Sequence, residues 1–154
     1  ALATGRKLII AGNRPEEGSE RDFWHSRIEP YLGRKGIEWI GPVNDMQKNK
    51  LLGSAAAMIA PVQWDEPFGI VFVEALACGT PVISCPRGAL PEIIRHDIDG
   101  FLVSGKDEIC EAAGHLHLLS RAGCRKRAED NFSVAVVALQ YEQLYMESAG
   151  ALAR

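Results

Sequence analysis

The sequence predicts an α/β fold, a doubly wound, Rossmann-like parallel sheet of about five strands with helices on both faces. Short apolar runs alternate along the chain with segments whose apolar residues recur at helical spacing. The apolar runs are continuous rather than alternating with polar residues, which is typical of parallel strands buried on both faces. Right-handed crossovers and the usual winding of such sheets favour the strand order 2-1-3-4-5.

Five apolar runs supply the predicted strands. The first ends at Gly12, and the second is closed by the pair Gly41-Pro42, which stops a strand. The third ends near Val62, the fourth is very short, and the fifth follows a turn. In chain order, the predicted strands cover residues 7–12, 37–41, 57–62, 81–84 and 100–103.

The segments between the strands carry helix signals. Phe23, Trp24 and Ile28 recur at helical spacing and predict a helix over 20–32, which Gly33 ends. Asp45 is the expected N-cap of the next helix. The remaining helices are expected at 45–52, 70–78, 89–95, 106–120, 122–131 and 134–148.

Composition and charge bound the class of protein. The 154 residues amount to one domain, expected over 1–154, and the net charge of −3 lacks the basic footprint of nucleic-acid binders. No apolar run reaches the roughly 20 residues that span a bilayer. The four cysteines are too few for a disulfide scaffold and are expected to be reduced, which favours a cytoplasmic location.

The segment after Val62 carries the strongest chemical signal. An acidic loop containing Glu66 leads to Gly69, which opens a helix, and Glu74 follows on the second turn of that helix. A helix N-terminus presents unpaired N–H groups and about half a positive charge, so it suits a phosphate. Gly69 lacks the Cβ that would keep a ligand away from the backbone.

The two carboxylates suggest what accompanies the phosphate. Glu66 and Glu74 would repel a phosphate, but carboxylates make strong charge-assisted hydrogen bonds to hydroxyl groups. A phosphate combined with several hydroxyls describes a nucleotide-sugar. The alternative is that both are helix-start acids that complement the macrodipole, and spacing alone leaves the two interpretations evenly matched.

The run from Glu66 to Glu74, continuing through Ala-Leu-Ala-Cys-Gly-Thr-Pro-Val-Ile to Ser84, resembles the E-x7-E signature of retaining GT-B glycosyltransferases. The match is to family 4, the group 1 type, which is related to bacterial glycogen synthases. The segments 88–94 and 99–103 resemble the next two blocks of that family, and 8–12 and 39–43 resemble two earlier ones. The resemblance covers about residues 5 to 148 and implies the C-terminal half of a GT-B fold.

The resemblance implies a role for each matching position. Glu66 would be the catalytic residue that faces the hydroxyls of the donor sugar, and Glu74 would hold the ribose hydroxyls. Val43 would meet the nucleobase through its backbone, and Gly88 would supply a tight turn near the sugar. For Lys48, a solvated helix lysine stays a slightly favoured alternative to a base contact. The full implied binding set is Gly12, Val43, Asp45, Lys48, Phe68, Gly69, Ile70, Val71 and Glu74, with the amides of Gly69, Ile70 and Val71 on the diphosphate.

The resemblance also implies parts that this chain does not contain. Family members carry an earlier strand and helix, with basic residues that reach the diphosphate, and an N-terminal domain that binds the acceptor. The chain is therefore expected to be a fragment of a hexosyltransferase that is inactive alone, uses a nucleotide-sugar as donor and needs no metal or other cofactor. Its expected partners are the donor and the N-terminal domain, and any peripheral membrane contact would pass through the missing domain. The alternative function is a non-catalytic nucleotide- or phosphate-binding α/β module.

Overall fold

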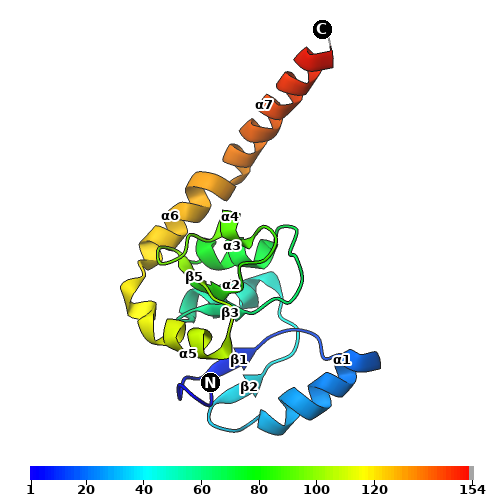
Figure 1. Cartoon of the computed structure of the whole chain (residues 1–154), viewed down its shortest axis with the longest axis vertical. Coiled ribbons are helices and arrows are strands. Elements are labelled where there is room, and N and C mark those ends of the chain that lie inside the picture. Colours follow the sequence, from blue (N-terminus) through cyan, green and yellow to red (C-terminus); the bar gives the residue numbers. More distant parts are fainter. Residues whose placement is uncertain (153–154) are drawn as a thin grey trace. The chain divides into compact units, whose positions relative to one another are not determined.

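The computed structural model describes residues 1–152, which fall into two compact units that meet in sequence at Lys50 (Figure 1). Each unit contains its own hydrogen-bonded sheet, and every strand pair in both sheets is parallel. The predicted α/β class with parallel strands and helices on both faces is therefore confirmed. No described helix is both long and apolar enough to cross a membrane.

The first unit contains a two-stranded sheet. Strand β1 (Leu8–Ile10) pairs with β2 (Ile37–Trp39) in the register that places Ile9 opposite Glu38. Trp39 packs edge-on against the buried Trp24 with 5.5 Å between ring centroids. Its indole Nε1 donates to the carbonyl oxygen of Gly12 over 3.0 Å, which fixes the chain where β1 ends.

The predicted helix over 20–32 is wrong in its continuity. The structure divides this segment into α1 (Gly18–Phe23), a π-helical turn η1 (Trp24–Ile28) and a 3₁₀ turn η2 (Glu29–Tyr31). Pro30 explains the break, because proline has no N–H to donate and its ring clashes with the preceding turn of an α-helix. The predicted helix over 106–120 is also shorter, since it gives way to a 3₁₀ turn after His115.

The second unit contains a three-stranded sheet with β4 at its centre, in the order β3-β4-β5. Helix α2 belongs to both units in sequence, since it crosses Lys50. In chain order the elements are α2 (Asp45–Ser54), β3 (Met58–Ala60), α3 (Ile70–Ala77), β4 (Val82–Ser84), α4 (Leu90–Ile93), β5 (Gly100–Leu102), α5 (Lys106–His115), η3 (Leu116–Leu118), α6 (Arg121–Phe132) and α7 (Val134–Leu152).

Two hydrophobic clusters cover the two faces of this sheet. Successive residues of a strand point to opposite faces, so Val82 enters one cluster and Ile83 enters the other, and both are fully buried. The Val82 cluster contains residues of α3, α4 and α6, including Leu76 in the last turn of α3. The Ile83 cluster contains Phe101 and the small residues of α5. This arrangement is the double winding that the sequence predicts.

The predicted order 2-1-3-4-5 is correct for the neighbours within each sheet and wrong for one continuous sheet. The strands pair as 2-1 and as 3-4-5, with no hydrogen-bonded ladder between β1 and β3 among residues 1–152. The physical reason is that the chain divides into two compact units and each sheet is contained within one of them. The missing strand that the resemblance implies between β1 and β3 stays a prediction.

A buried carboxylate joins β5 to the helices of the second unit. Asp99 is completely buried, and its two oxygens accept from Arg95 Nε at 2.7 Å and Arg95 Nη2 at 2.8 Å. The guanidinium of Arg127 lies 4.0 Å away. Asp99 also raises the pKa of Arg95, chiefly through the side-chain hydrogen bond between them.

Cys124 is expected to resist alkylation in the native protein. Burial, with a further contribution from Asp99, raises the pKa of its thiol to about 11, and its side chain is fully buried on α6. At pH 8, iodoacetamide should therefore modify the half-buried Cys110 first and Cys124 only in urea-unfolded protein, as mass spectrometry of the digested protein would show. Because the folded-state pKa is raised, the stabilisation from this protonated thiol is fully present below about pH 9 and is lost as the pH rises toward about 11. Equal labelling of both cysteines in the native state would contradict the burial.

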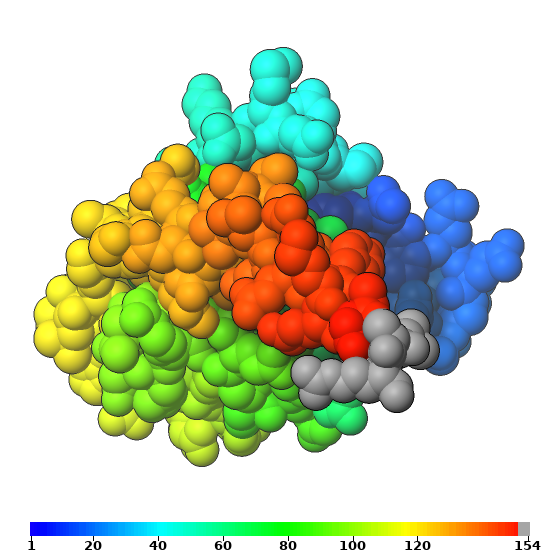
Figure 2. All heavy atoms as spheres, turned by 90° about the horizontal axis from the view of Figure 1, so that it is seen from above, coloured from blue at the N-terminus to red at the C-terminus, as the bar shows by residue number. Residues whose placement is uncertain are grey.

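The side chains of α7 are largely exposed, as the view down that helix shows in orange to red (Figure 2). Val134 is 88% exposed and Tyr145 is 67% exposed. Val136 and Val137 near the start of the helix are partly buried. Val137 and the exposed Tyr141 and Leu144 line an open hollow of about 690 Å³ that Phe132 and Phe68 also line. The predicted helix over 134–148 is confirmed and extends to Leu152.

Candidate functional site

The loop after β3 reaches α3 through a glycine that no other residue can replace without strain. Gly69 has φ of +80°, a left-handed conformation that costs an L-residue about 1–2 kcal/mol. A Cβ at Gly69 would also lie 2.7 Å from Cε2 of Phe72, whose ring is buried in the core. The sequence therefore uses glycine here for two reasons, the turn itself and the packing beneath it.

The N-terminus of α3 is open at its first turn. Gly69 is the N-cap and has no side chain to accept from the helix, and its carbonyl receives the N–H of Phe72 at 3.0 Å. Ile70 and Val71 are 68% and 37% exposed, and no described residue accepts their N–H groups. Backbone donors in this arrangement, at the positive end of a helix dipole, can bind an anionic oxygen.

Glu66 is fixed in position by two neighbours. The indole Nε1 of Trp64 donates to its Oε2 over 2.9 Å, and its backbone carbonyl accepts from the N–H of Ala89 at 2.8 Å. The second bond brings the turn after β4 against the loop after β3. Gly88 makes that approach possible, since it has φ of +54° and a Cβ there would collide with the backbone of Glu66.

Glu74 lies one turn into α3. It is four residues beyond Ile70, so both side chains lie along the same face of the helix. Its side chain is partly buried. The structure thus places Glu66, the two exposed amides and Glu74 along one continuous stretch of loop and helix.

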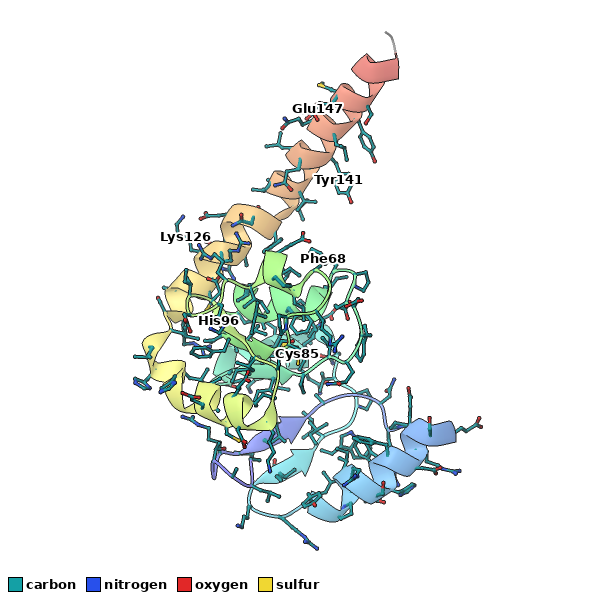
Figure 3. The ribbon with its side chains drawn as sticks, in the orientation of Figure 1. Phe68, Cys85, His96, Lys126, Tyr141 and Glu147 are labelled. Atoms are coloured by element: carbon teal, nitrogen blue, oxygen red, sulfur yellow. The ribbon has the colours of Figure 1, made fainter. Side chains whose placement is uncertain are left out.

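Phe68, which is predicted to join the binding set, makes a packing contact, and its role in binding stays a prediction. Its ring meets Phe132 of α6 edge-on, with 6.1 Å between centroids, and Arg127 lies over the Phe132 ring at 5.3 Å. Figure 3 shows Phe68 close to α3 and α4. This contact fixes the loop on the core of the second unit while leaving Phe68 43% exposed.

The four other predicted residues belong to the first unit. Gly12 has φ of +145° and donates its N–H to Gly41, and Val43 is half-buried in the loop after β2. Asp45 is not the N-cap of α2, since its side chain is 98% exposed and lies 3.2 Å from Lys48 Nζ. The cap is Asn44, one residue earlier.

Asn44 and Gln47 form a reciprocal capping box. Asn44 Oδ1 accepts the N–H of Gln47, and Gln47 Oε1 accepts the N–H of Asn44, both at 2.9 Å. A carboxylate at Asp45 is still favourable next to this helix start, because it lies in the first turn. The expectation that Asp45 helps to line a base pocket stays a prediction.

One polar hollow escaped the sequence interpretation. It has a volume of about 230 Å³, and its walls come from the loops that follow β3, β4 and β5. Figure 3 labels Cys85, one of its lining residues. The only available signal was that three strand ends carry polar residues. The lining residues are Gln63, Asp65, Cys85, Pro86, Arg87 and Ser104.

Comparison with known proteins decides the family. Residues 2–131 match the model of the family described as glycosyl transferases group 1. The chain belongs to this family. A D-inositol 3-phosphate glycosyltransferase of Salinispora tropica is 32% identical over 125 residues, a match that covers 81% of this chain and 26% of the relative.

Two solved structures have the same fold as this chain. Sucrose-phosphate synthase from Thermosynechococcus elongatus superposes with a TM-score of 0.77 at 26% identity, covering 94% of this chain and 39% of that one. Anabaena HepE, solved in complex with UDP-glucose, superposes with a TM-score of 0.72 at 21% identity, and the match covers 92% of this chain and 41% of the HepE chain. At this identity the match shows the fold alone. The chain spans 26% to 31% of the length of the curated relatives it matches.

Proposed function

We propose that this chain is the donor-binding domain of a retaining glycosyltransferase that moves a hexose from a nucleotide-sugar to an acceptor hydroxyl. The observation that carries the proposal is the open start of α3, flanked by Glu66 in its loop and Glu74 one turn along. Family membership and a neighbour solved with UDP-glucose support a nucleotide-sugar as the ligand. The free thiols of Cys85, Cys110 and Cys124 agree with a reducing, cytoplasmic location.

The proposed roles follow from charge. The amides of Gly69, Ile70 and Val71 stabilise the negative charge that grows on the departing diphosphate, which is electrostatic catalysis by preorganised donors. Glu74 accepts hydrogen bonds from the vicinal ribose hydroxyls, and Glu66 orients the sugar hydroxyls. The C1–oxygen bond to the diphosphate breaks and its electron pair leaves with the phosphate oxygen. The bond from C1 to the acceptor oxygen forms on the same face, and the acceptor's hydroxyl proton passes to that departing phosphate oxygen. No metal or further cofactor takes part.

The remaining partners lie outside these 154 residues. An upstream domain binds the acceptor, and an upstream strand and helix add basic side chains to the diphosphate. The isolated chain therefore lacks half of the preorganised cleft and does not turn over donor. The proposed contacts of Gly12, Val43, Asp45 and Lys48 with the nucleoside, including that of the Val43 backbone with the base, come from the family resemblance.

Titration of the complete protein with UDP and with UDP-glucose distinguishes the proposed roles of Glu66 and Glu74. Glu74→Ala should weaken the binding of both ligands tenfold or more, because charge-assisted hydrogen bonds contribute about 1.5–3 kcal/mol each. Glu66→Ala should keep the affinity for UDP within twofold of the wild type and weaken the binding of UDP-glucose. Isothermal titration calorimetry measures both effects.

Glu111→Ala is the matched control, since Glu111 is an exposed acid on α5 of the same unit. Its affinity for both ligands should equal that of the wild type. Unchanged UDP affinity in Glu74→Ala would remove the ribose assignment. UDP and UDP-glucose binding without any transfer by the complete protein would favour the non-catalytic nucleotide-binding module instead.

A further inference from the structure

The polar hollow beside Glu66 is built where ligands of open parallel sheets bind. Its residues follow the carboxyl ends of all three strands of the second unit: Gln63 and Asp65 after β3, Cys85 and Arg87 after β4, and Ser104 after β5. Open α/β sheets bind ligands outside the carboxyl ends of their strands. Its volume of about 230 Å³ is below the roughly 300–1,000 Å³ of a whole ligand pocket, so it suits one substituent of a larger ligand.

Among the residues that the structure describes, Arg87 is the one cation that lines this hollow. Its backbone is fixed from both sides, because its N–H donates to the Cys85 carbonyl at 2.9 Å and its carbonyl accepts from Leu90 at 3.2 Å. The side chain is exposed, and no residue in the described part of the chain forms an ion pair with it. The guanidinium thus has a fixed origin and unused donors.

The turn that carries Arg87 is held directly against Glu66. Gly88 lies in contact with the backbone of Asp65 and Glu66, and the next residue, Ala89, donates to the Glu66 carbonyl at 2.8 Å. Arg87 therefore enters the hollow from the turn that also positions the proposed sugar-orienting carboxylate. Any group bound there lies next to whatever Glu66 contacts.

We infer that Arg87 is a specificity-determining residue that binds an anionic substituent, a carboxylate or a phosphate, on the sugar or acceptor held beside Glu66. A planar guanidinium with five donors matches the two oxygens of a carboxylate or phosphate. Asp65, Gln63 and Ser104 add a carboxylate, an amide and a hydroxyl that suit neighbouring hydroxyl groups. The inference rests on the proposed function, because it names the chemistry of a ligand at that same site.

Two sources can supply the anion, and two titrations of the complete protein distinguish them. A uronic acid on the donor is tested with UDP-glucuronate against UDP-glucose. A phosphate on the acceptor is tested with D-inositol 3-phosphate added to UDP-saturated protein. In each arm the wild type is compared with Arg87→Gln, which removes the charge and keeps a shorter, polar side chain. Lys126→Gln, which removes an exposed cation on α6, is the control.

Arg87→Gln should weaken the binding of the anionic ligand tenfold or more and change the affinity for UDP-glucose by less than twofold. Lys126→Gln should change neither affinity. The effect in the first arm assigns the anion to the donor, and the effect in the second assigns it to the acceptor. If the protein binds UDP but Arg87→Gln changes its affinity for neither anionic ligand, this inference is wrong and the proposed function stands. If the wild type itself does not bind UDP, the proposed function is wrong and this inference is wrong with it.

Discussion

Gly88→Ala lowers the free energy of unfolding by about 2–4 kcal/mol. At temperatures where the variant stays folded, it weakens the binding of UDP-glucose at least tenfold. The left-handed φ of +54° costs alanine about 1–2 kcal/mol. The added Cβ then meets backbone atoms, including the Asp65 carbonyl carbon at 2.8 Å, and backbone gives way less easily than a side chain. Relief of that contact moves Glu66 and breaks its bond to Ala89.

Urea denaturation and calorimetric titration measure the two effects of Gly88→Ala. The matched control is Gly114→Ala in α5, where a Cβ meets nothing within 4 Å and the backbone is helical. Alanine there should raise stability by roughly 0.5–1 kcal/mol, since glycine is a poorer helix former. Wild-type stability together with wild-type binding in Gly88→Ala would show that the turn does not hold Glu66.

Asp99→Asn should lower the free energy of unfolding by about 3 kcal/mol. The amide keeps the shape of the carboxylate but loses its charge, and its NH₂ group then faces one of the two guanidinium donors of Arg95. Asp99 is fully buried, so water does not reach the new amide, whereas the Arg95 side chain is 47% exposed and can turn a freed donor to solvent. Urea denaturation measures the change.

Asp97→Asn serves as the control for Asp99→Asn. Asp97 lies two residues away with a side chain that is 71% exposed, and its φ of +63° is a conformation that asparagine tolerates well. Its stability should stay within about 0.5 kcal/mol of the wild type. Equal effects of the two substitutions would mean that the burial of Asp99 does not govern the contribution of its ion pair with Arg95.

Local patterns were sufficient for much of the fold. Continuous apolar runs marked β3, β4 and β5, and the glycine before α3 marked the helix start with its open amides. These features depend on residues close together in the chain. Pro30 was visible in the sequence too, and its effect on the first predicted helix was missed because the apolar spacing from Phe23 to Ile28 was given more weight.

Features that depend on distant segments were not predictable in the same way. The bond from Ala89 to Glu66 joins loops that follow different strands, and no local spacing announces it. The polar hollow around Arg87 requires three strand ends to meet, so it becomes visible only with the sheet order and register. The Asn44–Gln47 capping box was readable from sequence, but the adjacent Asp45 was an equally good cap by residue type.

The position of β4 determines how precisely the candidate site is held. Its residues are buried on both faces of the sheet, it pairs with a strand on each side, and Ser84 Oγ donates to the Ala60 carbonyl at 2.6 Å. Such a strand opens only when the whole unit unfolds, so its amide protons should be among the slowest to exchange. Arg87 and Gly88 follow this strand within four residues. A ligand bound there would lose little affinity to ordering the protein, because that part of the backbone is already immobile before binding.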